Sequence, residues 1–109
     1  MLVVDDDAAF AERLVVFLED LLPGREIVSV ADGNSALTSA LDLRPANVLL
    51  DVGMPGPSGV RVANTLAQAL PGTHIVILSG GDRPDDLPPG ADYVRKDERM
   101  EARLRELLT

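Results

Sequence analysis

The chain has 109 residues, 46% of them hydrophobic, so it is long enough for one domain with a single core but not for two. It contains no cysteine, which excludes disulfides and thiolate metal sites, and its net charge of −8 with 3% aromatic residues argues against direct binding to nucleic acid. No stretch has the character of a signal peptide or a membrane span, so a cytoplasmic protein that does not bind membranes is expected.

Short apolar runs alternate with stretches of helical periodicity in the first half of the chain. Residues 2–4 predict a strand, and the helix after them ends at Pro23. Residues 27–31 predict a second strand, followed by a helix that begins near Asp32 and ends before Pro45. The apolar positions expected to face the core are Phe10, Leu14, Phe17, Leu18 and Leu21 in the first helix, and Ala36, Leu37, Ala40 and Leu41 in the second.

The second half of the chain continues the alternation. Residues 46–51 predict a strand in which the apolar run Val48-Leu49-Leu50 ends in an acid, which is typical of a strand at the centre of a parallel sheet. A third helix is predicted from Ser58, a plausible N-cap, and residues 73–79 predict a fourth strand. Residues 92–95 predict a short fifth strand, and the last helix carries its apolar face on Met100, Leu104, Leu107 and Leu108.

Residues 80–90 break the pattern, because Pro84, Pro88 and Pro89 prevent a full helix there. The expected fold is therefore α/β: a flavodoxin-like, doubly wound, five-stranded parallel sheet of order 2-1-3-4-5, with the fourth helix shortened or absent. One domain is expected to span residues 1–109. The loop at 80–90 is expected to be its most mobile part.

Five polar residues follow the predicted strands: Asp5, Asp6, Asp51, Ser79 and Lys96. The carboxyl ends of parallel strands meet at one edge of the sheet, where α/β proteins bind their ligands. Clustered carboxylates either take up protons or recruit a cation, and Mg²⁺ suits a site with few protein ligands and room for water. Lys96 is the only lysine in the chain, and with a hydroxyl, a cation and a free carboxylate it suits phosphoryl transfer.

These motifs resemble those of the response-regulator receiver domains of two-component phosphorelay signalling. The matching segments occur in the same order as in the family and are Val3-Val4-Asp5-Asp6-Asp7, Leu49-Leu50-Asp51-Val52-Gly53-Met54-Pro55-Gly56 with Ser58-Gly59, Ile77-Leu78-Ser79-Gly80, and Gly90-Ala91-Asp92-Tyr93-Val94-Arg95-Lys96-Asp97. They cover nearly the whole chain.

The resemblance implies a role for each site residue. Asp51 would accept a phosphoryl group from a histidine kinase or a histidine phosphotransfer protein. Asp5, Asp6, Asp51 and the backbone carbonyl of Gly53 would hold Mg²⁺. Ser79 and Lys96 would bind the phosphoryl oxygens, and Tyr93 would swing inward on activation. Such a domain is a phosphoacceptor rather than an enzyme, with at most self-catalysed phosphorylation and dephosphorylation.

The resemblance also implies partners: a downstream protein, a fused effector, or a second copy of the domain. Lys96 followed by Asp97 resembles LuxR-type DNA-binding transcription regulators. Two other functions stay open: a haloacid-dehalogenase-like phosphohydrolase, and a protein-interaction module that does not depend on phosphorylation. Neither Gly53 nor Gly81 has a side chain to shield a phosphoryl group from water, so a short-lived acyl phosphate is expected.

Single residues also have ordinary structural explanations. Asp5, Asp6 and Asp7 could cap a helix, and Tyr93 could simply pack on a half-buried strand. His74, the only histidine, is expected to face solvent, and the acids at 82–86 to lie in a solvated loop.

Overall fold

Strands and helices alternate along the chain in the computed structural model, which describes residues 1–53 and 58–109. The strands are β1 (Leu2–Val4), β2 (Val28–Val30), β3 (Asn47–Asp51), β4 (His74–Ser79) and β5 (Asp92–Arg95). The helices are α1 (Ala8–Leu21), α2 (Gly33–Leu43), α3 (Gly59–Ala69) and α4 (Met100–Leu108). The part of the receiver-like motif at Met54-Pro55-Gly56, with Pro57, lies outside the described residues.

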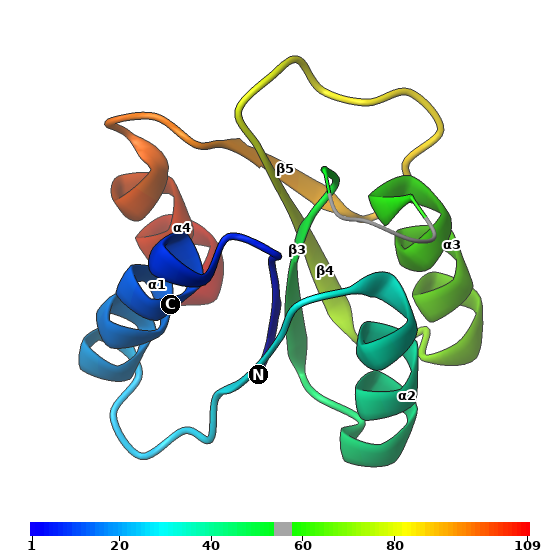
Figure 1. The fold of residues 1–109 in the computed structure, drawn as a ribbon, viewed down its shortest axis with the longest axis horizontal. Helices are drawn as coiled ribbons and strands as arrows, with labels where there is room; N and C mark the ends of the chain where they lie inside the picture. The colour runs from blue at the N-terminus through cyan, green and yellow to red at the C-terminus, as the bar shows by residue number, and fades with distance from the viewer. Residues whose placement is uncertain (54–57) are drawn as a thin grey trace.

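The five strands form one parallel sheet in the order β2-β1-β3-β4-β5, as predicted. Helices α1 and α4 cover one face of the sheet, and α2 and α3 cover the other (Figure 1). Residues on the central strands therefore point alternately into two apolar layers. On β3, for example, Val48 and Leu50 pack toward α2 and α3, whereas Leu49 packs toward α1 and α4.

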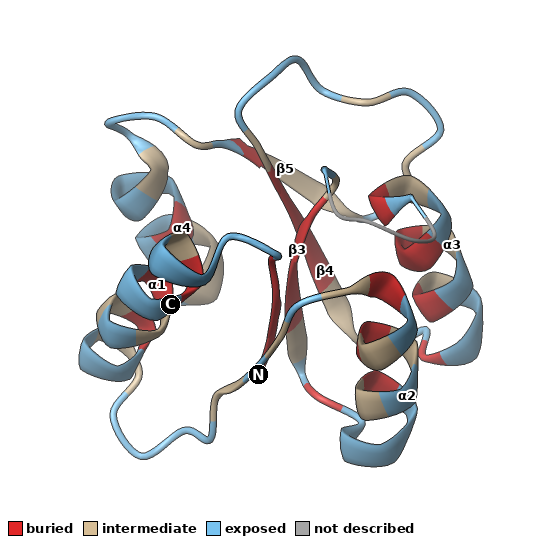
Figure 2. Cartoon of the chain, viewed as in Figure 1, coloured by how far each residue is buried: buried red, intermediate tan, exposed pale blue. Residues whose placement is uncertain are grey.

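The central strands are almost fully buried, whereas the outer faces of the helices are exposed (Figure 2). A strand buried on both faces needs apolar side chains at every position, which explains the unbroken apolar runs in β1, β3 and β4. None of the described helices has both the length and the apolar character needed to cross a bilayer.

Three helices begin with a side-chain cap. Asp7 accepts a hydrogen bond from Phe10 N at 3.1 Å, Asp32 accepts one from Ser35 N at 2.8 Å, and Ser58 accepts one from Arg61 N at 3.2 Å. Hydrogen bonds from the Ser35 amide and hydroxyl lower the pKa of Asp32. Because Asp7 alone caps α1, helix capping does not account for Asp5 or Asp6.

Two expectations about single side chains are wrong. Leu41, expected on the buried stripe of α2, is 53% exposed, because the small Ala36 and Ala40 make the contact with the sheet and Leu41 lies about 100° around the helix from Ala40. His74 does not simply face solvent. Its Nδ1 lies 3.3 Å from Asn47 Nδ2, because Asn47 on β3 pairs with His74. Its Nε2 lies 2.6 Å from Asp92 Oδ2, because Asp92 begins β5 opposite Val76, the next residue on the same face of β4.

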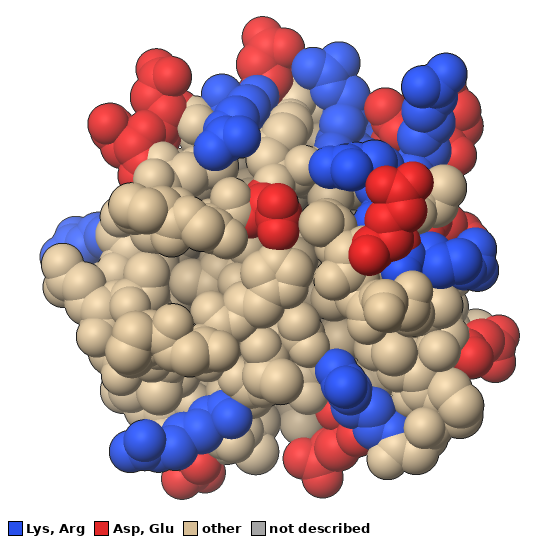
Figure 3. All heavy atoms as spheres, turned by 180° about the vertical axis from the view of Figure 1, so that it is seen from behind, with Lys and Arg blue, Asp and Glu red and all other residues tan. Residues whose placement is uncertain are grey.

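Residues 80–91 contain no helix, as the prolines predict. The loop passes over α3, where Asn64 Nδ2 donates a hydrogen bond to Asp86 O at 2.9 Å (Figure 1). A groove of about 440 Å³ lies between this loop and α3, and its lining includes Ala67, Ile75 and Pro88 but no charged side chain. Charged side chains gather mostly near the margin of the face of the molecule seen in Figure 3.

We expect the amides of residues 80–90 to exchange with solvent faster than those of β4. The amide of Gly81 donates to a side chain, Ser79 Oγ, and no amide of 80–90 joins the sheet, whereas β4 is hydrogen-bonded to a strand on both sides. Amide hydrogen exchange followed by NMR measures this difference, and uniformly slow exchange across 80–90 would contradict it.

Candidate functional site

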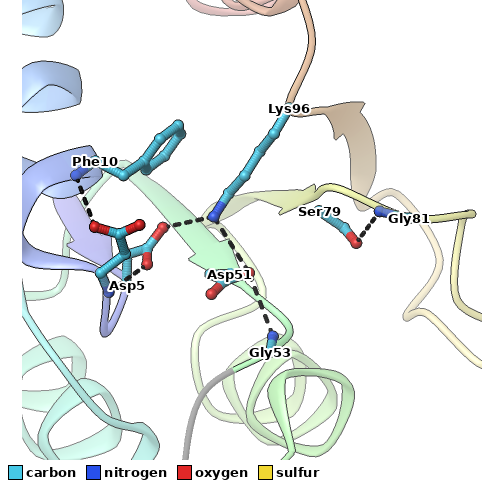
Figure 4. Close-up of polar contacts among 8 residues, drawn as sticks. Asp5, Phe10, Asp51, Gly53, Ser79, Gly81 and Lys96 are labelled. Carbon is cyan, nitrogen blue, oxygen red and sulfur yellow. Dashed lines mark hydrogen bonds and ion pairs between the residues drawn. The ribbon is translucent and has the colours of Figure 1, made fainter.

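The strand register brings the predicted site residues to one edge of the sheet. Val4 on β1 pairs with Leu50 on β3, so the next residues, Asp5 and Asp51, lie side by side at the carboxyl ends of the two strands. Ser79 pairs with Arg95, which places Lys96 just beyond the end of β4. The close-up in Figure 4 shows Asp5, Asp51 and Lys96 pointing toward one another.

Three carboxylates meet at this edge. Each of Asp5, Asp6 and Asp51 offers an oxygen, and these oxygens lie within 4.8 Å of one another. Asp5 is 3% exposed and Asp51 9% exposed, while Asp6 faces solvent. Two nearly buried acids and an exposed one form a site that is open on one side. Hard oxygen ligands with room for water are what Mg²⁺ requires, so these residues fit that ion.

Lys96 is the positive group of the cluster. Its Nζ lies 2.8 Å from Asp5 Oδ2 and 3.5 Å from Asp51 Oδ1. Its backbone N–H donates to Ser79 O at 2.8 Å, which fixes the start of the side chain beside β4. Three carboxylates and one ammonium leave an excess of negative charge, and like charges about 4 Å apart repel by roughly 1 to 4 kcal/mol. The site therefore favours a divalent cation.

Backbone amides hold both buried carboxylates in place. Asp7 N donates to Asp5 Oδ1 at 2.9 Å, and Gly53 N donates to Asp51 Oδ1 at 3.3 Å. These bonds leave Asp5 Oδ2 facing Lys96 and Asp51 Oδ2 available for another partner. The backbone amides two residues after each acid thus orient the carboxylates, as expected for acids at strand ends.

Ser79 is at the same edge, but its hydroxyl is bonded within its own loop. Ser79 Oγ accepts a hydrogen bond from Gly81 N at 3.1 Å (Figure 4). The structure therefore brings Asp5, Asp6, Asp51 and Lys96 into contact distance of one another, and it holds Ser79 at the next strand end with a different partner.

Tyr93 and Arg95, on β5, contact the same loop. The Tyr93 hydroxyl donates to the Gly81 carbonyl, and Arg95 forms an ion pair with Asp82 at 3.0 Å. Hydrogen bonding and charge interaction with Tyr93, and to a lesser extent with Asp82, raise the pKa of Arg95 above its usual value. The other acids expected in a solvated loop, Asp85 and Asp86, are exposed.

Two further residues shape the site without having been predicted from the sequence. The Phe10 ring lies under the Lys96 ammonium, 4.1 Å from its Nζ, although the periodicity indicates only that Phe10 faces the core. Gly59 begins α3 so close to β3 that an added Cβ would lie 2.4 Å from Val52 Cα. The Ser58-Gly59 pair is visible in the sequence, but the reason for the glycine is not.

Comparisons with known proteins agree with this geometry. A family model described as the response regulator receiver domain matches residues 1–104. The DNA-binding response regulator MtrA of Mycobacterium tuberculosis is 39% identical over 96% of this chain and 50% of its own length. A protein-glutamate methylesterase/protein-glutamine glutaminase of Myxococcus xanthus is 34% identical over 81% of this chain and 26% of its own length.

Solved structures show the same fold. The signal receiver domain of the response regulator NarL from Mycobacterium tuberculosis is 28% identical, with a TM-score of 0.82 over 98% of this chain and 90% of that one. A CheY-like receiver domain protein from Methanospirillum hungatei is 23% identical, with a TM-score of 0.84 over 98% of this chain and 88% of that one, and it supports the fold alone.

The chain spans about half the length of the MtrA relatives it matches. Its strand order, the three clustered aspartates and the family match over residues 1–104 all point to the same assignment. The chain belongs to the response regulator receiver domain family.

Proposed function

We propose that this domain, spanning residues 1–109, receives a phosphoryl group on Asp51 from the phosphohistidine of a histidine kinase or a phosphotransfer protein. An oxygen of Asp51 forms the new bond to phosphorus as the bond from phosphorus to the imidazole nitrogen breaks, and the imidazole keeps that electron pair. The observation that carries the proposal is the position of Asp51, nearly buried between two further acids and the only lysine of the chain.

Asp5, Asp6 and Asp51, with the backbone carbonyl of Gly53, would hold Mg²⁺, which supplies positive charge opposite the phosphoryl oxygens. Lys96 is placed to pair with the same oxygens, since its Nζ is already 3.5 Å from Asp51 Oδ1. Because these groups belong to the domain itself, a small phosphodonor should also phosphorylate Asp51, and water should hydrolyse the acyl phosphate to the free Asp51 carboxylate and inorganic phosphate without a separate enzyme.

Conformational switching would pass through the loop that follows β4. Gly81 N donates to Ser79, and Gly81 O accepts from Tyr93, so one residue joins the hydroxyl and the tyrosine. When Ser79 turns to bind a phosphoryl oxygen, its bond to Gly81 breaks and the loop is free to move with Tyr93. The phosphorylated state is then favoured by its extra contacts, which is a population shift between two arrangements.

The output of the domain is proposed to be a changed surface that an attached effector, a downstream protein or a second copy recognises. The MtrA relatives are named as DNA-binding response regulators, and the Myxococcus relative is named as a methylesterase. The receiver fold is therefore found with effectors of different chemistry. A DNA-binding effector fits the MtrA likeness, and the net charge of −8 makes direct contact of this domain with nucleic acid unfavourable.

The test is to incubate the protein with acetyl phosphate and Mg²⁺ and to measure its intact mass. We expect one added phosphoryl group per molecule, only when Mg²⁺ is present. NMR spectra with Mg²⁺ and beryllofluoride should show shifts at Asp51, Ser79, Gly81 and Tyr93. A protein that gains no mass and shows no shift with Mg²⁺ would instead be an interaction module independent of phosphorylation, and turnover of a phosphate ester would indicate a phosphohydrolase.

Larger side chains at Gly53 and Gly81 are expected to lengthen the life of the acyl phosphate. A Cβ added at Gly53 would lie 3.7 Å from Asp51 Oδ2, and one added at Gly81 would lie 3.9 Å from Ser79 Oγ, so each fits without a clash and lies beside the reacting group. In Gly53→Gln and Gly81→Gln proteins, loss of the phosphoryl group should be slower by about threefold to tenfold, an effect of ~1 kcal/mol on the barrier. Unchanged dephosphorylation rates in both variants would show that water does not enter past these glycines.

A further inference from the structure

We propose that Phe10 is a positioning residue that holds the ammonium group of Lys96 over the site. The Lys96 Nζ lies 4.1 Å from the centroid of the Phe10 ring, 2.8 Å from Asp5 Oδ2 and 3.5 Å from Asp51 Oδ1. Figure 4 shows the ring and the two carboxylates around the end of the lysine side chain. The ammonium is thus held between an aromatic face and two negative charges.

Two independent contacts position Phe10, one through its backbone and one through its side chain. The backbone N–H of Phe10 donates to the capping carboxylate of Asp7 at 3.1 Å, which sets the first turn of α1. The half-buried Phe10 side chain also packs against the apolar layer beneath α1 and α4. Because Phe10 is held by the first turn of α1 and by the core, its ring can position the longer and more flexible side chain of Lys96.

The physical basis is the attraction between a cation and the negative face of an aromatic ring, which grows as the cation loses water. The Lys96 side chain is 20% exposed, so its ammonium is only partly hydrated. A leucine at position 10 could fill part of the space but offers no charge attraction. Lys96 would then depend on its carboxylate partners alone.

This dependence matters because Asp5 has two possible partners. Asp5 Oδ2 is the nearest carboxylate oxygen to Lys96, and Asp5 is also one of the three acids placed to hold a divalent ion. An ion bound to Asp5 competes with the ammonium for that carboxylate. The Phe10 ring strengthens the hold of the ammonium beside Asp5 before an ion binds, and because the ring itself binds no ion it can keep the ammonium near Asp51 once Asp5 binds the ion.

The position of the lysine can be measured directly, because the chain contains a single lysine. Protein labelled with ¹³C only in lysine gives one ε-methylene signal, and a ring facing the ammonium shifts the attached protons upfield. We expect this upfield shift in the wild type and in Phe10→Tyr, and its loss in Phe10→Leu.

Phe17→Leu is the matched control. Phe17 lies on the same helix under another cation, with its ring centroid 5.6 Å from Cζ of Arg105, and the same side-chain change there should leave the lysine signal in place. A lysine signal that stays shifted in Phe10→Leu, or that moves equally in Phe17→Leu, would overturn the proposal.

Metal binding and phosphorylation give a second readout, which rests on the proposed function. Without the ring, Lys96 competes less well for Asp5, so Phe10→Leu should bind Mg²⁺ more tightly but react with acetyl phosphate about threefold to tenfold more slowly at saturating Mg²⁺. A purely structural defect would weaken Mg²⁺ binding and slow phosphorylation together. Phe17→Leu, measured in the same two assays, is the control for such a defect. If no variant is phosphorylated but the lysine shift follows Phe10, the proposed function fails and the positioning role stands.

Discussion

Asp51→Asn is expected to abolish phosphorylation by acetyl phosphate at every Mg²⁺ concentration. The amide keeps the size of the side chain but removes the nucleophilic oxygen, and neither of the two neighbouring acids in the described part of the chain is placed to replace it. Asp5 Oδ2 is held by Lys96 at 2.8 Å, and Asp6 lies at the exposed side of the cluster. Loss of the nucleophile should therefore remove the reaction rather than slow it.

Intact mass after incubation measures the outcome, and Asp42→Asn provides the control. Asp42 is an exposed acid on α2, so this variant makes the same change of charge away from the site and should be phosphorylated like the wild type. Asp51→Asn should also unfold at a temperature no lower than that of the wild type, since removing one of three clustered carboxylates relieves repulsion. Full phosphorylation of Asp51→Asn would place the phosphoacceptor elsewhere in the chain.

Gly59→Ala is expected to lower the free energy of unfolding by about 2 to 4 kcal/mol. Its new Cβ would lie 2.4 Å from Val52 Cα, 2.9 Å from Asp51 O and 3.0 Å from Val52 Cβ. Two of these atoms are backbone atoms at the end of β3, so no side-chain rotation can relieve the overlap. Helix α3 must move away from the sheet, or the strand end that carries Asp51 must shift.

Urea unfolding of Gly59→Ala and Gly72→Ala separates this contact from the general effect of replacing a glycine. An added Cβ at Gly72 would meet no atom within 4 Å, so Gly72→Ala should change the free energy of unfolding by about 1 kcal/mol or less. Equal stability of the two variants would show that α3 does not pack against the end of β3 as closely as described. Where Gly59→Ala remains folded, phosphorylation should also be slower, because the displaced strand end carries Asp51.

The sequence by itself determined the architecture and the composition of the candidate site. Apolar runs identify strands buried on both faces, and prolines at 84, 88 and 89 remove the helix between β4 and β5. Once five alternating units imply a parallel sheet, the residues after each strand must gather at one edge. That single geometric rule predicts that Asp5, Asp6 and Asp51 converge, and the structure confirms it.

Only the tertiary structure decided which partners those residues have. Lys96 contacts Asp5 more closely than Asp51, Phe10 covers its ammonium, and Ser79 is bonded to Gly81. It also decided that Leu41 is exposed and that His74 pairs with Asp92. The spacing of apolar residues indicates which side of a helix or strand is buried, because buried positions recur at regular intervals along the element. Contacts between residues far apart in the sequence depend on the spacing and rotation of neighbouring elements, which no local pattern contains.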